Sequence, residues 1–196
     1  MKTFRNITAG LIAVTLSMVA LVASPQKGKD NDRDRANRFS ARLLGINEVP
    51  SVSTGATGSL KATISKDEQS IEYELTFTGL QSPVTQSHIH IAQPDVNGGI
   101  VIWFCQTAAA LDPVNTATQQ CPVNGGTIVG TIRPSDIRVQ AAQGLPTALS
   151  ASDKFDRVVA AIRSGNAYAN VHTAQSPGGE IRGQIQVGGG HKGDHD

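Results

Sequence analysis

The chain lacks both a cluster of lysines and arginines and a marked net charge. Its 17 basic and 16 acidic side chains leave a formal net charge of +1, so nucleic acids and anionic membrane surfaces are poor candidate partners. A Gly-x-Ser-x-Gly motif is also missing, and neither cysteine has a histidine beside it. The usual residues of a serine or cysteine hydrolase are therefore not recognisable. We predict no catalytic residue, and an enzyme is the less favoured class.

The first residues do not have the pattern of the rest of the chain. Residues 1–24 combine a basic start, an apolar stretch over residues 9–23 and small residues before Pro25, which is the layout of a secretory signal peptide. The alternative is a retained membrane anchor, but the uncharged stretch is short for a bilayer span. We therefore predict cleavage and export to a periplasm, a cell surface or the medium.

Polar segments flank a single domain. Residues 25–38 carry almost no apolar side chain to offset the entropy of ordering, so we predict a disordered polar linker. Residues 188–196 are rich in glycine and histidine and are predicted to be a flexible tail. Residues 39–187 remain, which is the length of one domain with one hydrophobic core.

Cysteine is scarce, since only Cys105 and Cys121 occur. Their spacing is not Cys-x-x-Cys, which argues against a redox pair or a thiolate metal site. In an exported chain thiols tend to oxidise, so we predict a structural disulfide. It would close a loop over residues 106–120, a stretch rich in alanine, threonine, asparagine and glutamine.

Alternation of apolar and polar residues dominates the domain. Between Ile71 and Thr78 every second residue is apolar, as in a half-buried antiparallel strand. The helical exception is an apolar stripe from Phe155 to Ile162, with Ser152 as its predicted N-cap and Gly165 after its end. We predict an all-β fold, an antiparallel Greek-key-like sandwich or barrel with one short covering helix. The other predicted strands cover residues 39–44, 59–64, 100–104, 127–132, 167–172 and 180–187.

Three of the five histidines lie in two strand-like runs far apart in the chain. Residues i and i+2 share one face of a strand, so His88 and His90 project together while Ile89 points to the other side. In the second run His172 shares a face with Tyr168 and Asn170, opposite a small apolar face. Each strand thus offers polar groups from one face.

Seven short motifs follow one another along the domain: 39–50 (FSARLLGINEVP), 71–73 (IEY), 79–80 (GL), 87–90 (SHIH), 97–98 (NG), 165–173 (GNAYANVHT) and 177–184 (PGGEIRGQ). Their order resembles the CHRD domain, a module named after chordin that also occurs singly in bacterial exported proteins. The resemblance implies an extracytoplasmic binding or scaffolding module whose ligand, a protein or a glycan, is unknown. Growth-factor binding does not follow, because the cysteine-rich repeats that capture ligand in chordin are absent.

A second and weaker resemblance is to copper/zinc superoxide dismutases. These also have a His-x-His strand, a later Val-His and a glycine-rich loop with an arginine, so His88, His90 and His172 are similar to three copper ligands and Arg182 to an anion-attracting arginine. No residue between His90 and His172 can serve as the bridging histidine or as the zinc histidines. A dinuclear centre and dismutase activity are therefore not expected.

Two interpretations of the histidines remain open at this point. Three imidazoles are a suitable ligand set for a single Cu²⁺ or Zn²⁺ ion, and nearby polar groups would accept their other N–H. Alternatively, the histidines and Arg182 form a hydrogen-bonded polar cluster that holds strands together without metal. The predicted supporting residues in either case are Asn170, Thr173, Glu180 and Arg182.

Overall fold

The computed structural model describes residue 32 and residues 34–188. The predicted signal peptide, part of the predicted linker and residues 189–196 of the predicted tail lie outside the described residues. Within the linker range, Asn37 is buried and accepts a hydrogen bond from Arg163 (2.7 Å). The first strand begins at Arg38, one residue before the predicted start of the domain.

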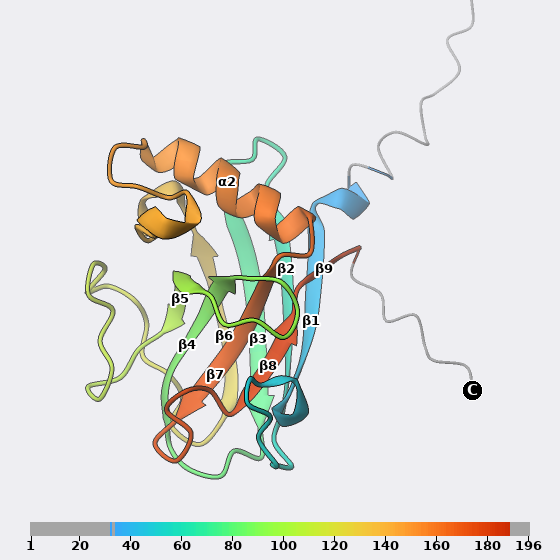
Figure 1. Cartoon of the computed structure of the whole chain (residues 1–196), viewed down its shortest axis with the longest axis vertical. Coiled ribbons are helices and arrows are strands. Elements are labelled where there is room, and N and C mark those ends of the chain that lie inside the picture. The colour runs from blue at the N-terminus through green and yellow to red at the C-terminus, as the bar shows by residue number, and fades with distance from the viewer. Residues whose placement is uncertain (1–31, 33, 189–196) are drawn as a thin grey trace, which may run out of the picture.

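Nine antiparallel strands form one strongly curved sheet (Figure 1). The order is β5-β4-β7-β8-β1-β2-β3-β6, with β9 paired to β1. Edge strands β5 and β6 come close to each other, so the sheet is a nearly closed barrel. The predicted all-β fold is confirmed. The strands are β1 (Arg38–Leu44), β2 (Thr57–Ile64), β3 (Ile71–Thr78), β4 (Val84–Ile91), β5 (Gly99–Cys105), β6 (Gly126–Ile132), β7 (Ala167–Thr173), β8 (Ile181–Gln184) and β9 (Gln186–Val187).

The alternation seen in the sequence decides which side chains enter the barrel. In β3, apolar residues are buried and the glutamates and Thr78 between them are exposed. In β7 both faces are buried: Ala167, Ala169 and Val171 join the core, and the polar residues between them face outward. The outer face of β7 is therefore covered by something other than the core.

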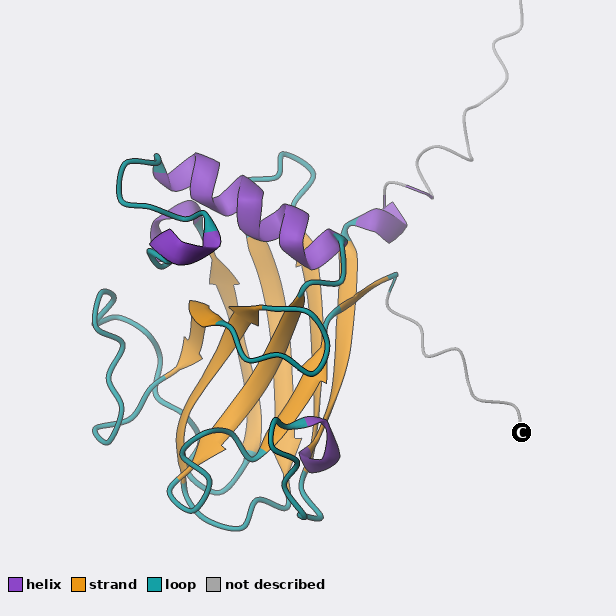
Figure 2. Ribbon diagram, in the orientation of Figure 1, coloured by secondary structure: helices purple, strands orange, loops and turns teal. Residues whose placement is uncertain are grey.

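Helix α2 (Ala151–Arg163) crosses one end of the barrel (Figure 2). Its buried stripe of Phe155, Val158, Val159 and Ile162 matches the predicted one. The predicted cap is wrong by two residues, because the Ser150 side chain accepts the hydrogen bond from the Asp153 amide. The left-handed Gly165 (φ 73°) ends the helix as predicted. Short 3₁₀ turns occur at η1 (Gly45–Asn47), η2 (Pro134–Asp136) and η3 (Ala141–Gln143).

The loop of residues 106–120 contacts edge strand β6, where its Gln119 side chain donates to the Val129 carbonyl (3.0 Å). The predicted disulfide between Cys105 and Cys121 closes this loop at its base. Gln106 exchanges backbone hydrogen bonds with Gln119 and Cys121 (2.9 Å each), and Asp112 forms a buried ion pair with Arg138. The loop is therefore tied to the barrel at both its base and its middle.

We expect the disulfide to stabilise the fold by about 3 kcal/mol, because it closes a loop of this length in the unfolded chain. Replacing Cys105 and Cys121 together by alanine should lower the free energy of unfolding by that amount in urea denaturation. Reductant should destabilise the wild-type protein similarly and leave the double variant unchanged. A double variant as stable as the wild type would mean that the loop is held by its hydrogen bonds alone.

Candidate metal centre

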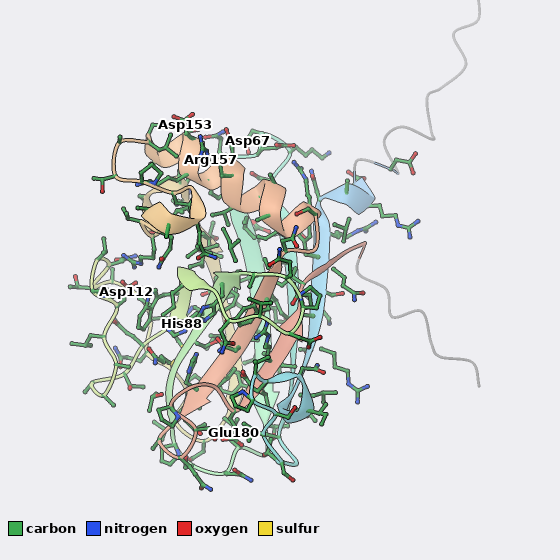
Figure 3. All side chains as sticks on the ribbon, viewed as in Figure 1. Asp67, His88, Asp112, Asp153, Arg157 and Glu180 are labelled. Atoms are coloured by element: carbon green, nitrogen blue, oxygen red, sulfur yellow. A yellow bond between two sulfur atoms is a disulfide. The ribbon has the colours of Figure 1, made fainter. Side chains whose placement is uncertain are left out.

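The three histidines of the two strand motifs meet on the outer face of the barrel; they are called the histidine cluster below. His88 and His90 come from β4, opposite the core residue Ile89, and His172 comes from the neighbouring β7. Although they point away from the core, their exposed fractions are only 0%, 7% and 6%. Figure 3 labels His88 on β4 within the body of the domain.

Two loops cover the cluster and bind its imidazoles. The Nδ1 atom of His90 lies 2.9 Å from the carbonyl oxygen of Gly98, in the loop between β4 and β5. The Nδ1 atom of His172 lies 2.9 Å from the carbonyl oxygen of Pro177, in the loop between β7 and β8. A carbonyl can only accept, so both Nδ1 atoms carry the proton and both Nε2 atoms keep a lone pair.

The ligand nitrogens of the cluster lie close enough to share one ion. One nitrogen from each imidazole lies within 4.8 Å of the others, and His88 Nδ1 is 3.2 Å from His172 Nε2. A tetrahedral ion with bonds of ~2.0–2.1 Å separates its nitrogen ligands by about 3.3 Å. The widest nitrogen separation would have to shorten by up to about 1.5 Å to reach that spacing.

Burial keeps the imidazoles uncharged. It lowers the pKa of His90 to about 4, against a weaker opposing effect of the hydrogen bond to Gly98. It also lowers the pKa of His172, and it lowers that of His88 well below its usual value, with His172 and His90 adding repulsion. Neutral imidazole is the form that binds a metal. Because His172 Nε2 accepts, the His88 Nδ1 atom beside it carries a proton in the metal-free protein, and this proton would have to move to Nε2 before Nδ1 could bind an ion.

Two lone pairs in the cluster have no suitable hydrogen-bond partner. The Nε2 atom of His90 faces the Oδ1 atom of Asn170 at 3.1 Å, which brings two acceptors together. If the Asn170 amide were turned round, its NH₂ group would face His90 and supply a donor, but its Oδ1 atom would then face the Glu48 carboxyl. That second contact is favourable only when the Glu48 carboxyl is protonated. The buried Nε2 atom of His88 has no hydrogen-bond partner among the described residues. A bound cation would relieve the first conflict.

Aromatic rings hold the imidazoles in place. The Tyr168 ring stacks on His90 with centroids 4.7 Å apart and planes 1° from parallel. The Arg182 guanidinium lies 3.4 Å from the Tyr168 centroid. Because β7 runs between β4 and β8, Tyr168 is held between these two partners. Trp103 of β5 packs edge-on against His88 at 4.2 Å.

Glu48 belongs to this region, although the sequence did not single it out as a site residue. It is buried beside Arg182 and accepts a hydrogen bond from Asn170. Burial raises the pKa of Glu48 to about 7, against the lowering effects of the Arg182 charge and its hydrogen bonds. A Cβ atom at Gly179, where φ is +125°, would collide with this carboxylate. Glu48 lies in the FSARLLGINEVP segment, but nothing in that segment indicated its long-range contact.

The other predicted supporting residues take different positions. Asn170 contacts His90, and Arg182 reaches the cluster through Tyr168. Thr173 and Glu180 instead bond to each other (2.7 Å), and Glu180 also accepts hydrogen bonds from Thr54 and the Gln81 amide (2.9 Å each). Within the described part of the chain, no hydrogen bond joins Thr173 or Glu180 to an imidazole.

Two glycine-containing loop segments near the cluster differ in structure. Residues 176–179 form a tight turn, closed by the Gly179 amide on the Ser176 carbonyl (3.0 Å). Asn97 and Gly98 instead end the longer β4–β5 loop, and Asn97 joins that loop to Val49 and Arg182. The polar atoms of Asn97 thus serve tertiary contacts as well as the connection between these strands.

The fold and the site define an antiparallel β-domain that buries three neutral imidazoles under loops on its outer face. A family model described as the CHRD domain matches residues 39–185. The chain therefore belongs to the CHRD domain family, as its motifs predicted. No match was found among curated proteins. Within residue 32 and residues 34–188, no helix has the length and apolar character needed to cross a membrane.

Proposed function

We propose that the chain is an exported CHRD module that binds one Cu²⁺ or Zn²⁺ ion through His88, His90 and His172. The observation that carries the proposal is the convergence of three neutral imidazoles, two of which already have Nδ1 fixed on backbone carbonyls. This is the arrangement in which outer partners orient metal-binding histidines.

Export is part of the same proposal. The signal-peptide pattern of residues 1–24 and the Cys105–Cys121 disulfide support an oxidising compartment outside the cytoplasm. There the module would act as a binding or scaffolding unit. The cavity beneath Trp103 and the cavity beside Arg182 are lined by none of the three histidines, so neither supplies a substrate path to the ion. We therefore propose a resident ion rather than a dismutase.

The first test is metal analysis of the full-length protein, carried out with His191 and His195 changed to alanine so that the tail contributes no ligand. After incubation with Cu²⁺ or Zn²⁺ and desalting, we expect about one ion per chain, the capacity of a single three-histidine site. Changing His88, His90 and His172 together to glutamine should abolish retention, because a neutral side chain of similar size replaces each ligand.

A matched comparison separates the ligands from the fold. Circular dichroism should show the same β-rich spectrum for the parent and the glutamine variant. The parent protein should gain thermal stability with added metal, because the ion binds only the folded state, whereas the variant should not. A folded parent that retains no metal would rule out the resident ion.

A second candidate function is a metal-free interaction module. The hydrogen bonds from His90 to Gly98 and from His172 to Pro177 would by themselves hold the covering loops on the sheet. In that case the loops present a surface to a protein or a glycan, and the histidines affect stability alone. Metal analysis distinguishes the two candidates.

A further inference from the structure

A cavity of about 150 Å³ lies where the two edge strands of the barrel approach each other; it is called the seam cavity below. Residues of β3, β5 and β6 line one side of it, and the disulfide-closed loop of residues 106–120 lines the other. Figure 3 labels Asp112 on this loop, to the left of His88. The cavity is far larger than the ~30 Å³ share of one water and smaller than the ~300–1,000 Å³ of pockets for drug-sized ligands. It has the size for one small ring.

The seam cavity contains donors that the described residues leave unused. Arg138, only 6% exposed, lines the cavity and pairs with Asp112 through Nη2. Its Nε and Nη1 atoms are buried and have no hydrogen-bond partner among the described residues. Buried charged donors are normally satisfied by protein, water or ligand. Both atoms have almost no surface accessible to a water-sized probe, so an acceptor inside the cavity would complete this guanidinium only after a small shift of the Arg138 side chain.

The charges around the seam cavity argue against an anion as that acceptor. Arg138 contributes one positive charge, and Asp112 and Asp136 contribute two negative charges, so the lining carries a formal charge of −1. A carboxylate or phosphate would face Asp136 without a second cation. The bound group should therefore be neutral.

The remaining polar groups of the lining require a ligand that both donates and accepts. Asp136 accepts hydrogen bonds from Arg133 and Asn115 (2.8 and 3.3 Å) and, with two lone pairs on each oxygen, has room for a further donor. Gln119 uses its amide N–H groups on Tyr73 and Val129 (2.7 and 3.0 Å), which leaves its carbonyl as an acceptor. Hydroxyl groups satisfy both requirements, since each donates once and accepts twice.

An aromatic side chain completes the lining. Trp103, the only tryptophan of the chain, borders the seam cavity. Its ring also contacts the His88 ring of the neighbouring strand β4. Small-molecule sites typically combine such aromatic surface with a few placed polar groups. The apolar C–H face of a sugar ring fits aromatic surface, and its hydroxyls fit the polar groups.

We propose that the seam cavity binds a neutral polyhydroxylated ring, as presented by one pyranose residue of a glycan. After that side-chain shift Arg138 would donate to ring or hydroxyl oxygens, and Asp136 and Gln119 would accept from hydroxyls. The proposal does not depend on the metal ion, because it uses none of the three histidines.

The test uses the metal-free, full-length protein after chelation. Glucose, galactose, mannose and N-acetylglucosamine are titrated separately while the fluorescence of Trp103 and ligand-observed NMR signals are recorded. We expect at least one sugar to bind saturably with a Kd of about 1 mM, the range for a ligand of this size. Because the ligand is neutral, raising the salt concentration should leave this Kd unchanged.

Two substitutions on the same exposed loop provide a matched pair. Ala117→Phe should fill the mouth of the seam cavity and abolish binding, because Ala117 lines it. Ala109→Phe places the same side chain at an exposed position outside the lining and should leave the Kd unchanged. Arg138→Met should also abolish binding, but it breaks the pair with Asp112, so Ala117→Phe is the decisive variant.

Three outcomes would overturn the proposal. The first is the absence of saturable binding by all four sugars in the folded wild-type protein. The second is binding that persists unchanged in Ala117→Phe, which would place the sugar elsewhere on the surface. The third is salt-sensitive binding of acetate or inorganic phosphate in the cavity, which would assign it to anions.

Discussion

Replacing Arg182 by alanine is expected to lower the free energy of unfolding by about 3–5 kcal/mol, the range for removing one partner of a buried charged group. Arg182 is 2% exposed and donates to the carbonyl oxygen of Val96 (2.8 Å) and to Oδ1 of Asn97 (3.0 Å). It also covers the Tyr168 ring and offsets the charge of Glu48. Alanine would leave these acceptors without a donor and open a cavity under the β4–β5 loop.

Urea denaturation at neutral pH measures this effect, and two variants bracket it. Arg182→Lys keeps the charge but loses the planar contact with Tyr168 and the paired donors, so it should fall between alanine and the wild type. Arg42→Ala removes an exposed arginine from neighbouring β1 and should change stability by no more than about 0.5 kcal/mol. A loss below about 1 kcal/mol in Arg182→Ala would contradict the buried role.

The same substitution should weaken metal binding. Without the guanidinium, Tyr168 is free to move, and the His90 ring stacked on it loses a fixed orientation. Outer partners of metal ligands typically affect affinity by about 10–100-fold. Arg182 itself contacts no ligand nitrogen among the described residues, so its effect on metal affinity would be indirect, through Tyr168 and His90.

The sequence was sufficient to predict which face of each strand carries the histidines. The His-x-His spacing in β4 and the alternation in β7 determine side-chain direction through the two-residue period of a strand. Their adjacency was not predictable in this way, since it depends on pairing between strands whose paired residues are about 80 positions apart. The order of motifs suggested it only through resemblance to a family.

The alternation of apolar and polar residues could not predict that the histidine cluster is buried. Loops contribute the covering atoms, as in the Gly98 and Pro177 carbonyls, and loops have no repeating pattern from which contacts can be inferred. Glu48 is the clearest example, because its partners Asn170 and Arg182 are more than 120 residues away. The Arg138–Asp112 pair at the seam was missed for the same reason.

The free energy of unfolding of the metal-free protein is expected to fall steeply as the pH is lowered from 6.5 towards 4.5. The three histidines are neutral in the folded protein because burial lowers their pKa values, that of His90 to about 4. In the unfolded chain they take up protons near the ordinary value of about 6.5. Their contribution to stability is therefore present above pH ~6.5 and is lost as the pH falls towards the folded-state values.

Glu48 acts in the opposite direction over part of this range. Its pKa is raised from 4.5 to about 7, so the folded protein keeps a proton that the unfolded chain releases. Its contribution is greatest below pH ~4.5 and is lost as the pH rises through about 7. On unfolding, the three histidines take up about three protons and Glu48 releases one, so the unfolded chain binds about two protons more than the folded protein. The free energy of unfolding therefore changes by roughly 2.7 kcal/mol per pH unit where its slope is steepest.

Urea denaturation at pH 7.0, 6.0 and 5.0 measures this slope, and two variants test its origin. His90→Gln removes one titrating imidazole and should reduce the slope by about 1.4 kcal/mol per pH unit, whereas Glu48→Gln should increase it by about the same amount. With Zn²⁺ present the wild-type slope between pH 7.0 and 5.0 should change little, because the folded-state imidazoles are already neutral there and protons compete with the ion only near their lowered pKa values. An unchanged stability between pH 7.0 and 5.0 would mean that the imidazoles titrate equally in both states, and the cluster could then be neither buried nor preorganised for a metal.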